Sequence, residues 1–110
     1  MGDVKRMDKR YCFGVDVGGT TVKIGLFETD GTIMDKWEIK TNTADHGSAV
    51  LPDIAQSLEE KLREHGIEKR LVEGIGLGVP APVSAEGIVQ NTANLGWGYK
   101  EVKREMEELM

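Results

Sequence analysis

The 110-residue sequence is poor in several features that would each point to a particular class of protein. Its single cysteine, Cys12, cannot form a disulfide within the chain, and its position in an apolar segment predicts a small buried side chain rather than a reactive thiol. No apolar run approaches the roughly 20 residues that span a membrane, so we expect no membrane partner. Residues 1–10 are charged and lack the apolar core of a secretion signal, so we expect a disordered leader there and a cytoplasmic location.

Positive charge is also scarce. The chain has 14 lysines and arginines against 19 aspartates and glutamates, a net charge of −5, and no basic cluster offsets this excess. That balance argues against a nucleic-acid partner. With 39% apolar and 30% charged residues, the composition is typical of one soluble globular domain with a core of its own.

The most informative stretch is residues 13–27. An apolar run that contains Asp16 ends at two glycines and predicts a buried strand. Residues 22–27 alternate apolar and polar side chains, as a strand covered on one face does. The two strands form a hairpin whose tip has no bulky side chain and consists of Gly18, Gly19, Thr20 and Thr21.

This tip has the composition of a phosphate site. The glycines let a phosphate oxygen approach backbone N–H groups, the threonines add hydroxyl donors, and Lys23 adds a cation. Asp16 can hold Mg²⁺ through water, because Mg²⁺ prefers oxygen ligands and keeps part of its hydration shell. From this stretch alone, an ordinary hairpin capped by an aspartate is an equal alternative. The stretch contains neither a dinucleotide fingerprint nor a P-loop.

After this hairpin the sequence predicts a third antiparallel strand, a loop and a helix. Asp30 and Gly31 form a turn signal before a strand at residues 32–40, and residues 41–47 read as a polar loop. A helix over residues 48–65 would have Ser48 as N-cap and end at Gly66. Its apolar residues form one stripe, which consists of Leu51, Ile54, Ala55, Leu58 and Leu62.

Residues 73–80 alternate glycine with apolar residues and predict a strand whose glycine face lies close under a helix. Its carboxyl end is where open α/β sheets bind ligands. A small hairpin or flap at residues 83–90 precedes a polar loop in which Asn94 suits a polyol site, whereas Trp97 is expected in the core. A last helix over residues 99–110 would bury a stripe formed by Val102, Met106 and Leu109.

Three motifs in this order resemble the N-terminal part of the ROK-family sugar kinases, most closely the bacterial ATP-dependent glucokinases. They are Asp16-Val-Gly-Gly-Thr-Thr-Val-Lys, then Gly76-Leu-Gly-Val-Pro-Ala-Pro-Val, then Asn94-Leu-Gly-Trp. The resemblance implies an α/β fold of the ribonuclease-H-like, actin-like ATPase type over residues 11–110. It also implies a mixed sheet of three antiparallel strands and one parallel strand, helices packed on it, and a truncated lobe that lacks its last strand.

The resemblance also implies residue roles in converting a hexose to hexose 6-phosphate with ATP and Mg²⁺. ATP phosphates would meet Gly18, Gly19, Thr20, Thr21 and Lys23, and Asp16 would act through the metal. The sugar would meet Ala81, Pro82, Thr92, Ala93 and Asn94. The family usually has glycine where this chain has Ala81, and the extra methyl group narrows the approach of a sugar to the backbone. The family's general base and its zinc motif are expected beyond residue 110, so we expect the isolated chain to be inactive and to have no zinc site.

Other classes stay open. A ROK-type transcription regulator would need a helix-turn-helix before the first strand, and the ten residues there are too few. An actin-like or acetate-kinase-like ATP-binding protein, or a non-catalytic sugar- or nucleotide-binding lobe, are further alternatives. Without a fifth strand beside residues 74–79, that edge of the sheet would be unpaired, so we expect a homo-oligomer formed through it or a marginally stable chain.

Overall fold

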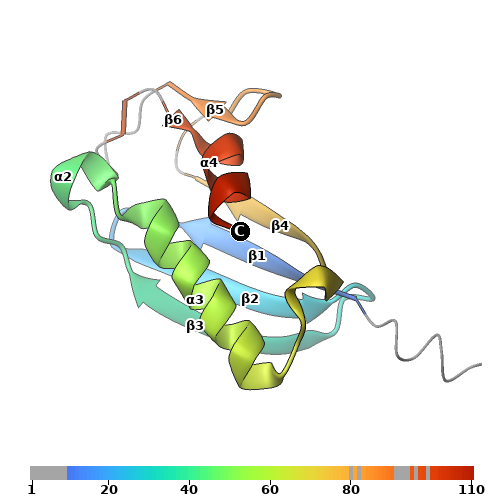
Figure 1. Ribbon diagram of the computed structural model, residues 1–110. Helices are drawn as coiled ribbons and strands as arrows, with labels where there is room; N and C mark the ends of the chain where they lie inside the picture. The colour runs from blue at the N-terminus through green and yellow to red at the C-terminus, as the bar shows by residue number, and fades with distance from the viewer. Residues whose placement is uncertain (1–9, 80, 82, 91–94, 96, 99) are drawn as a thin grey trace, which may run out of the picture.

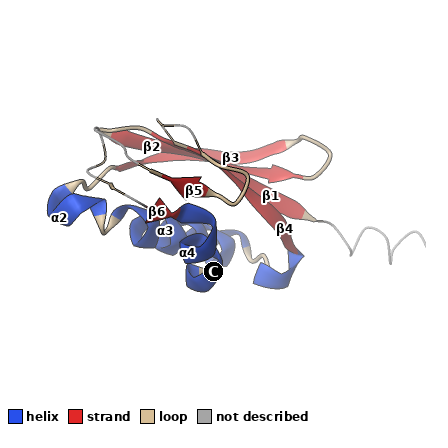
Figure 2. Ribbon diagram, turned by 90° about the horizontal axis from the view of Figure 1, so that it is seen from above, coloured by secondary structure: helices blue, strands red, loops and turns tan. Residues whose placement is uncertain are grey.

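The computed structural model describes residues 10–79, 81, 83–90, 95, 97–98 and 100–110, and shows a mixed sheet with helices on one face (Figures 1 and 2). The strands are β1 (Tyr11–Val17), β2 (Thr21–Glu28), β3 (Ile33–Lys40) and β4 (Val72–Gly78). Their order is β3-β2-β1-β4, with β1, β2 and β3 antiparallel in turn and β4 parallel to β1. This confirms the predicted sheet of three antiparallel strands and one parallel strand.

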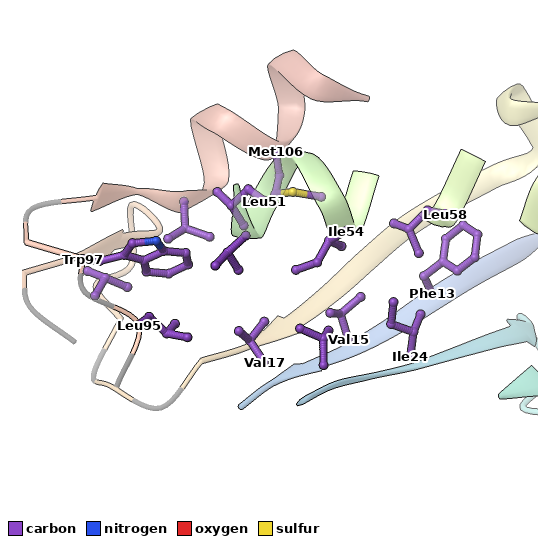
Figure 3. Packing of buried hydrophobic residues seen from close by; sticks show 14 of the residues in the cluster. Phe13, Val15, Val17, Ile24, Leu51, Ile54, Leu58, Leu95, Trp97 and Met106 are labelled. Atoms are coloured by element: carbon purple, nitrogen blue, oxygen red, sulfur yellow. The ribbon is translucent and has the colours of Figure 1, made fainter. Parts of the chain in front are cut away.

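The core lies between this sheet and the long helix α3 (Val50–His65). Alternation along β1 and β2 sends one set of side chains toward the helix, namely Phe13, Val15, Val17, Val22, Ile24 and Leu26, all buried. The helix contributes a buried stripe of Val50, Leu51, Ile54, Ala55, Leu58 and Leu62. Figure 3 shows Leu51, Ile54 and Leu58 directed at the strands. The predicted helix and its apolar stripe are therefore confirmed.

The two ends of α3 differ in how well the sequence predicted them. Gly66 ends the helix in the left-handed conformation with φ +67°, as expected. The predicted N-cap at Ser48 is wrong: Ala49 occupies that position, and the Ser48 hydroxyl lies 3.2 Å from a carboxylate oxygen of Asp45. The segment predicted as a plain loop also contains the short α2 (Ala44–Gly47), in which Asp45, His46 and Gly47 have positive φ.

After α3, the 3₁₀ turn η1 (Lys69–Leu71) leads into β4, which lies at the edge of the sheet. The expectation that a helix covers its glycine face is wrong. Gly74 and Gly76 are exposed, and a Cβ built at Gly74 would meet nothing within 4 Å. The described helices all lie on the opposite face of the sheet (Figure 2).

The C-terminal part forms a two-stranded sheet and a short helix. The predicted flap is confirmed: Gly87 donates its N–H to the Ser84 carbonyl at 2.9 Å, and β5 (Ile88–Val89) follows. β5 pairs with β6 (Lys100–Glu101), and α4 (Val102–Leu109) begins directly after it. The helix therefore starts later than predicted. Val102 and Met106 are buried as expected, but Leu109 is 38% exposed.

Single residues complete the comparison. Trp97 is 2% exposed, which confirms its expected place in the core. Cys12 is half-buried rather than fully buried, because it lies on the sheet face that the helices leave open. The predicted leader over residues 1–9 lies outside the described residues. Among the described residues, none of the helices has both the length and the apolar composition needed to cross a bilayer.

Candidate functional site

The tip of the β1–β2 hairpin is a tight turn with two open donors. Gly18 donates its N–H to the Thr21 carbonyl at 3.0 Å, so the expectation that both glycine N–H groups face a ligand is wrong for Gly18. A Cβ at Gly18 would lie 2.8 Å from that same carbonyl oxygen, which explains the glycine. Gly19 and Thr20 are exposed, and none of the described residues accepts their N–H groups. Two neighbouring N–H groups are therefore free to bind an anion.

Thr41 stabilises this tip through two hydrogen bonds, and the sequence did not predict this role. Its hydroxyl donates to the Gly18 carbonyl at 2.8 Å, and its N–H donates to the Thr20 carbonyl at 2.9 Å. Thr41 is only 6% exposed and is the one buried polar residue among those described. The β2–β3 register, which pairs Thr21 with Lys40, brings it there. No local pattern identifies Thr41, because its partners lie more than 20 residues earlier in the chain.

Asp16 and Lys23 lie directly opposite each other one step back from the tip. Both are exposed and point away from α3, and strand alternation places Thr21 on the same face as Lys23. Asp16 and Lys23, together with Lys36 of β3, line a shallow depression of about 380 Å³ on the open face of the sheet. The structure thus brings together one carboxylate, one ammonium group and one hydroxyl beside the open N–H groups.

Glycines leave part of the open face of the sheet without projecting side chains. Gly14 pairs with Gly25 on one side and with Gly76 on the other, so three glycines form a row across three strands. The ring of Phe27 lies over part of the row, and a Cβ at Gly25 would lie 2.7 Å from that ring. A larger side chain at Gly25 would displace the Phe27 ring and fill part of the depression beside Asp16 and Lys23.

The donor set at the hairpin tip fits Mg²⁺. No group of three or more histidine, cysteine, aspartate or glutamate side chains that could hold a metal occurs among the described residues. Mg²⁺ is commonly held by one or two carboxylates together with substrate phosphates and water. Asp16, a lone exposed carboxylate beside two open N–H groups, matches that chemistry, and bound Mg²⁺ would supply neutralisation of phosphate charge.

Of the residues expected to bind sugar, the structure describes one. Ala81 is half-buried and packs against the core. Pro82, Thr92, Ala93 and Asn94 lie outside the described residues. On either side of residues 91–94 the chain is firmly anchored, since Val89 and Leu95 are both fully buried.

Trp97 anchors the far side of the same segment. Its indole N–H donates to the Gly47 carbonyl at 3.0 Å, and its ring lies within the core (Figure 3). The ammonium group of Lys100 lies 5.4 Å from the ring centroid. Trp97 is therefore a structural residue that fixes the backbone next to the predicted sugar loop.

A second charged cluster, away from the hairpin tip, has a structural role. Asp35 on β3 accepts from His65 at 3.0 Å and from Lys61 at 3.1 Å, both on α3. The bond from His65, and then that from Lys61, lowers the pKa of Asp35 below its ordinary value. The same carboxylate raises the pKa of Lys61. Lys61 also lies 4.9 Å from the centroid of the Trp37 ring, so the cluster fastens the C-terminal half of α3 to β3.

The fold and the hairpin define a lobe of the type found in ROK sugar kinases. Residues 12–110 match the ROK family, and the chain belongs to that family. It is 41% identical over 103 residues to a glucokinase from Halalkalibacterium halodurans, which covers 93% of this chain and 31% of that enzyme.

Two solved structures share the fold. A ROK hexokinase from Thermus thermophilus matches with a TM-score of 0.74 and 29% identity, covering 90% of this chain and 32% of that one. A ROK-family glucokinase from Streptomyces griseus, in complex with glucose and AMPPNP, matches with a TM-score of 0.72 and 23% identity over 89% of this chain and 30% of that one. The chain spans about a third of the length of these relatives.

Proposed function

We propose that this chain is the lobe of an ATP-dependent glucokinase that holds the ATP phosphates and part of the sugar. The proposal rests mainly on one observation: the open N–H groups of Gly19 and Thr20 lie at the tip of the hairpin that carries Asp16 and Lys23. The identity of 41% to a glucokinase supports a kinase rather than a sugar-responsive regulator. The reaction would move the terminal phosphoryl group of ATP to glucose and yield glucose 6-phosphate, the substrate of glycolysis.

In this proposal the hairpin residues divide the work by their chemistry. The N–H groups of Gly19 and Thr20 and the hydroxyls of Thr20 and Thr21 bind phosphate oxygens, while Gly18 shapes the turn. Lys23 neutralises phosphate charge, and Asp16 holds Mg²⁺ through water. Because phosphoryl transfer depends on positioning and on charge neutralisation, these roles serve the reaction without forming a covalent bond.

The sugar side is proposed from the resemblance and from the name of the relative. Ala81, Pro82, Thr92, Ala93 and Asn94 would contact glucose, with the amide of Asn94 bonding sugar hydroxyls. The buried anchors Leu95 and Trp97 support this role, since they hold the backbone beside the loop in a fixed place.

The remaining parts of the proposal follow from the reaction. The chain covers 31% of the matched glucokinase, so the proposed roles concern phosphate and sugar binding and assign neither a general base nor an adenine site. A cytoplasmic location fits a protein that uses ATP and glucose. We also propose that the chain forms a homo-oligomer.

Calorimetric titration with Mg²⁺ and AMPPNP tests the proposal. The wild-type chain should bind the nucleotide, Asp16→Asn should remove the dependence on Mg²⁺, and Lys23→Ala should weaken binding. Asp53→Asn and Lys69→Ala serve as matched controls on other elements and should leave binding unchanged. Equal loss in the controls, or no binding by a folded wild-type chain, would reject the phosphate site. An accompanying assay of ATP-dependent glucose phosphorylation should show no turnover.

A further inference from the structure

The last residue of β3, Lys40, lies at the end of the sheet that carries the proposed phosphate site. The β2–β3 register pairs it with Thr21, the first residue of β2. Directly opposed residues of antiparallel strands have Cβ atoms about 5 Å apart on the same face of the sheet. The side chain of Lys40 therefore begins beside the side chain of Thr21, which carries one of the proposed phosphate-binding hydroxyls.

Alternation along β3 directs Lys40 to the open face of the sheet. Trp37 and Ile39 pack against the core, whereas Lys40 is exposed. Because successive side chains of a strand point to opposite faces, Lys40 lies on the face away from α3. Asp16 and Lys23 lie on that face too. The register places Lys40 two residues nearer to the hairpin tip than Lys23.

Two hydrogen bonds of the next residue, Thr41, fix the backbone of Lys40 against the tip. The Thr41 N–H donates to the Thr20 carbonyl at 2.9 Å, and its hydroxyl donates to the Gly18 carbonyl at 2.8 Å. Both carbonyls belong to the turn that holds the open N–H groups of Gly19 and Thr20. A phosphate bound there would meet a lysine whose backbone is already in place, so binding has only its side chain to order.

The charges around the two lysines differ. Lys23 lies directly opposite Asp16 on β1 and directly opposite Glu38 on β3, so a carboxylate on each neighbouring strand offsets its charge. Lys40 lies opposite the neutral Thr21, and Glu38 is two residues away from it along β3. The cross-strand neighbours therefore offset the charge of Lys40 less than that of Lys23, and Lys40 is the better placed cation for an anion at the tip.

We propose that Lys40 is a further phosphate-binding residue of this lobe. Its ammonium group contacts the phosphate that the N–H groups of Gly19 and Thr20 hold, and it approaches from the side of β3, while Lys23 approaches from the side of Asp16. A lysine suits this task, because its ammonium group is a compact charge on a flexible stem. The inference rests on the proposed function and adds to it a cation from a third strand.

Calorimetric titration of the 110-residue chain with Mg²⁺ and AMPPNP, and separately with tripolyphosphate, tests this role. Lys40→Met keeps a long side chain and removes the charge, so it should weaken binding of both ligands roughly fivefold. Lys40→Arg should bind like the wild type, and Lys40→Glu should lose more affinity than Lys40→Met. Lys103→Met, at an exposed position on α4, makes the same change of charge on another element and should have no effect.

Salt and unfolding measurements separate a charge contact from a structural role. Added salt screens exposed charges, so the difference in affinity between the wild type and Lys40→Met should shrink as the ionic strength rises, while urea unfolding should show equal stability. Equal affinities of these two chains, or losses that do not follow the charge of the substituted side chain, would overturn the role of Lys40. Nucleotide binding that is lost in Lys23→Ala but unchanged in Lys40→Met would leave the proposed function intact, whereas no binding by a folded wild type would reject both.

Discussion

The indole N–H of Trp97 donates to the carbonyl of Gly47 at 3.0 Å, across 50 residues of sequence. This bond ties the segment after β5 to the turn that precedes α3. Gly47 has φ +71°, and a Cβ there would collide with the carbonyl oxygen of Leu95 and lie 2.8 Å from the indole nitrogen. Backbone conformation and close packing therefore both require glycine at this position.

Substitution of Gly47 by alanine should destabilise the chain strongly. Gly66 is a matched control, since it has φ +67° and open space around an added Cβ. Gly66→Ala should cost only the left-handed backbone strain, about 1–2 kcal/mol. Gly47→Ala adds a collision in the core and should cost about 2–5 kcal/mol in total. Urea unfolding of both variants measures the difference, and equal costs would show that the contact with Leu95 and Trp97 is unimportant.

Replacement of Thr41 by valine should loosen the hairpin tip. Valine keeps the shape of the side chain but removes the hydroxyl that donates to the Gly18 carbonyl, at a cost of about 1 kcal/mol in stability. If Thr41 positions the open N–H groups, Thr41→Val should also weaken binding of Mg²⁺ and AMPPNP several-fold. Thr43→Val is the control, since Thr43 is exposed and its side chain makes no capping bond. Unaltered nucleotide binding in a less stable Thr41→Val chain would limit Thr41 to a structural role.

Stability should fall in acid through Asp35. The pKa of Asp35 is lowered in the folded chain by the bonds from His65 and Lys61, so the folded state binds this proton less readily than the unfolded state. Its stabilisation is then complete above the ordinary carboxyl pKa of 3.8 and is lost as the pH falls through the lower, folded value. Asp35→Asn should destabilise the chain at neutral pH and converge with the wild type in acid. Urea unfolding across that range measures this, and a constant offset between the two proteins would contradict it.

Much of the fold could be predicted because its signals are local. Alternation in β1 and β2 and the apolar stripe of α3 each reflect a repeating period, and Gly66 ends its helix by a conformation that glycine favours. The start of α3 was missed because Ser48 bonds Asp45 instead of capping the helix, and competition between two nearby polar partners is not visible in the sequence.

The site was predicted less completely for a physical reason. The residue types at the hairpin tip indicate phosphate binding. Hydrogen bonds within the turn decide which backbone donors remain free, and the N–H of Gly18 is already bonded to the Thr21 carbonyl. Thr41 reaches the tip only through the register of β2 and β3. The glycines of β4 could be recognised as a bare face, but nothing local to them says which face the helices cover.

The most direct test of the central claim is an amide NMR titration of the 110-residue chain with Mg²⁺ and AMPPNP, and then with glucose. The account predicts that the nucleotide shifts the amide signals of Gly19, Thr20, Thr21 and Lys23. Asp16→Asn should abolish those shifts that depend on Mg²⁺. Glucose should shift the amide signals of Ala81 and residues 92–94. Residues around Met106 should be unaffected by either ligand. Nucleotide shifts that avoid the hairpin, or no shifts at saturating ligand in a folded chain, would contradict the assignment of this lobe as the phosphate-binding part of a glucokinase.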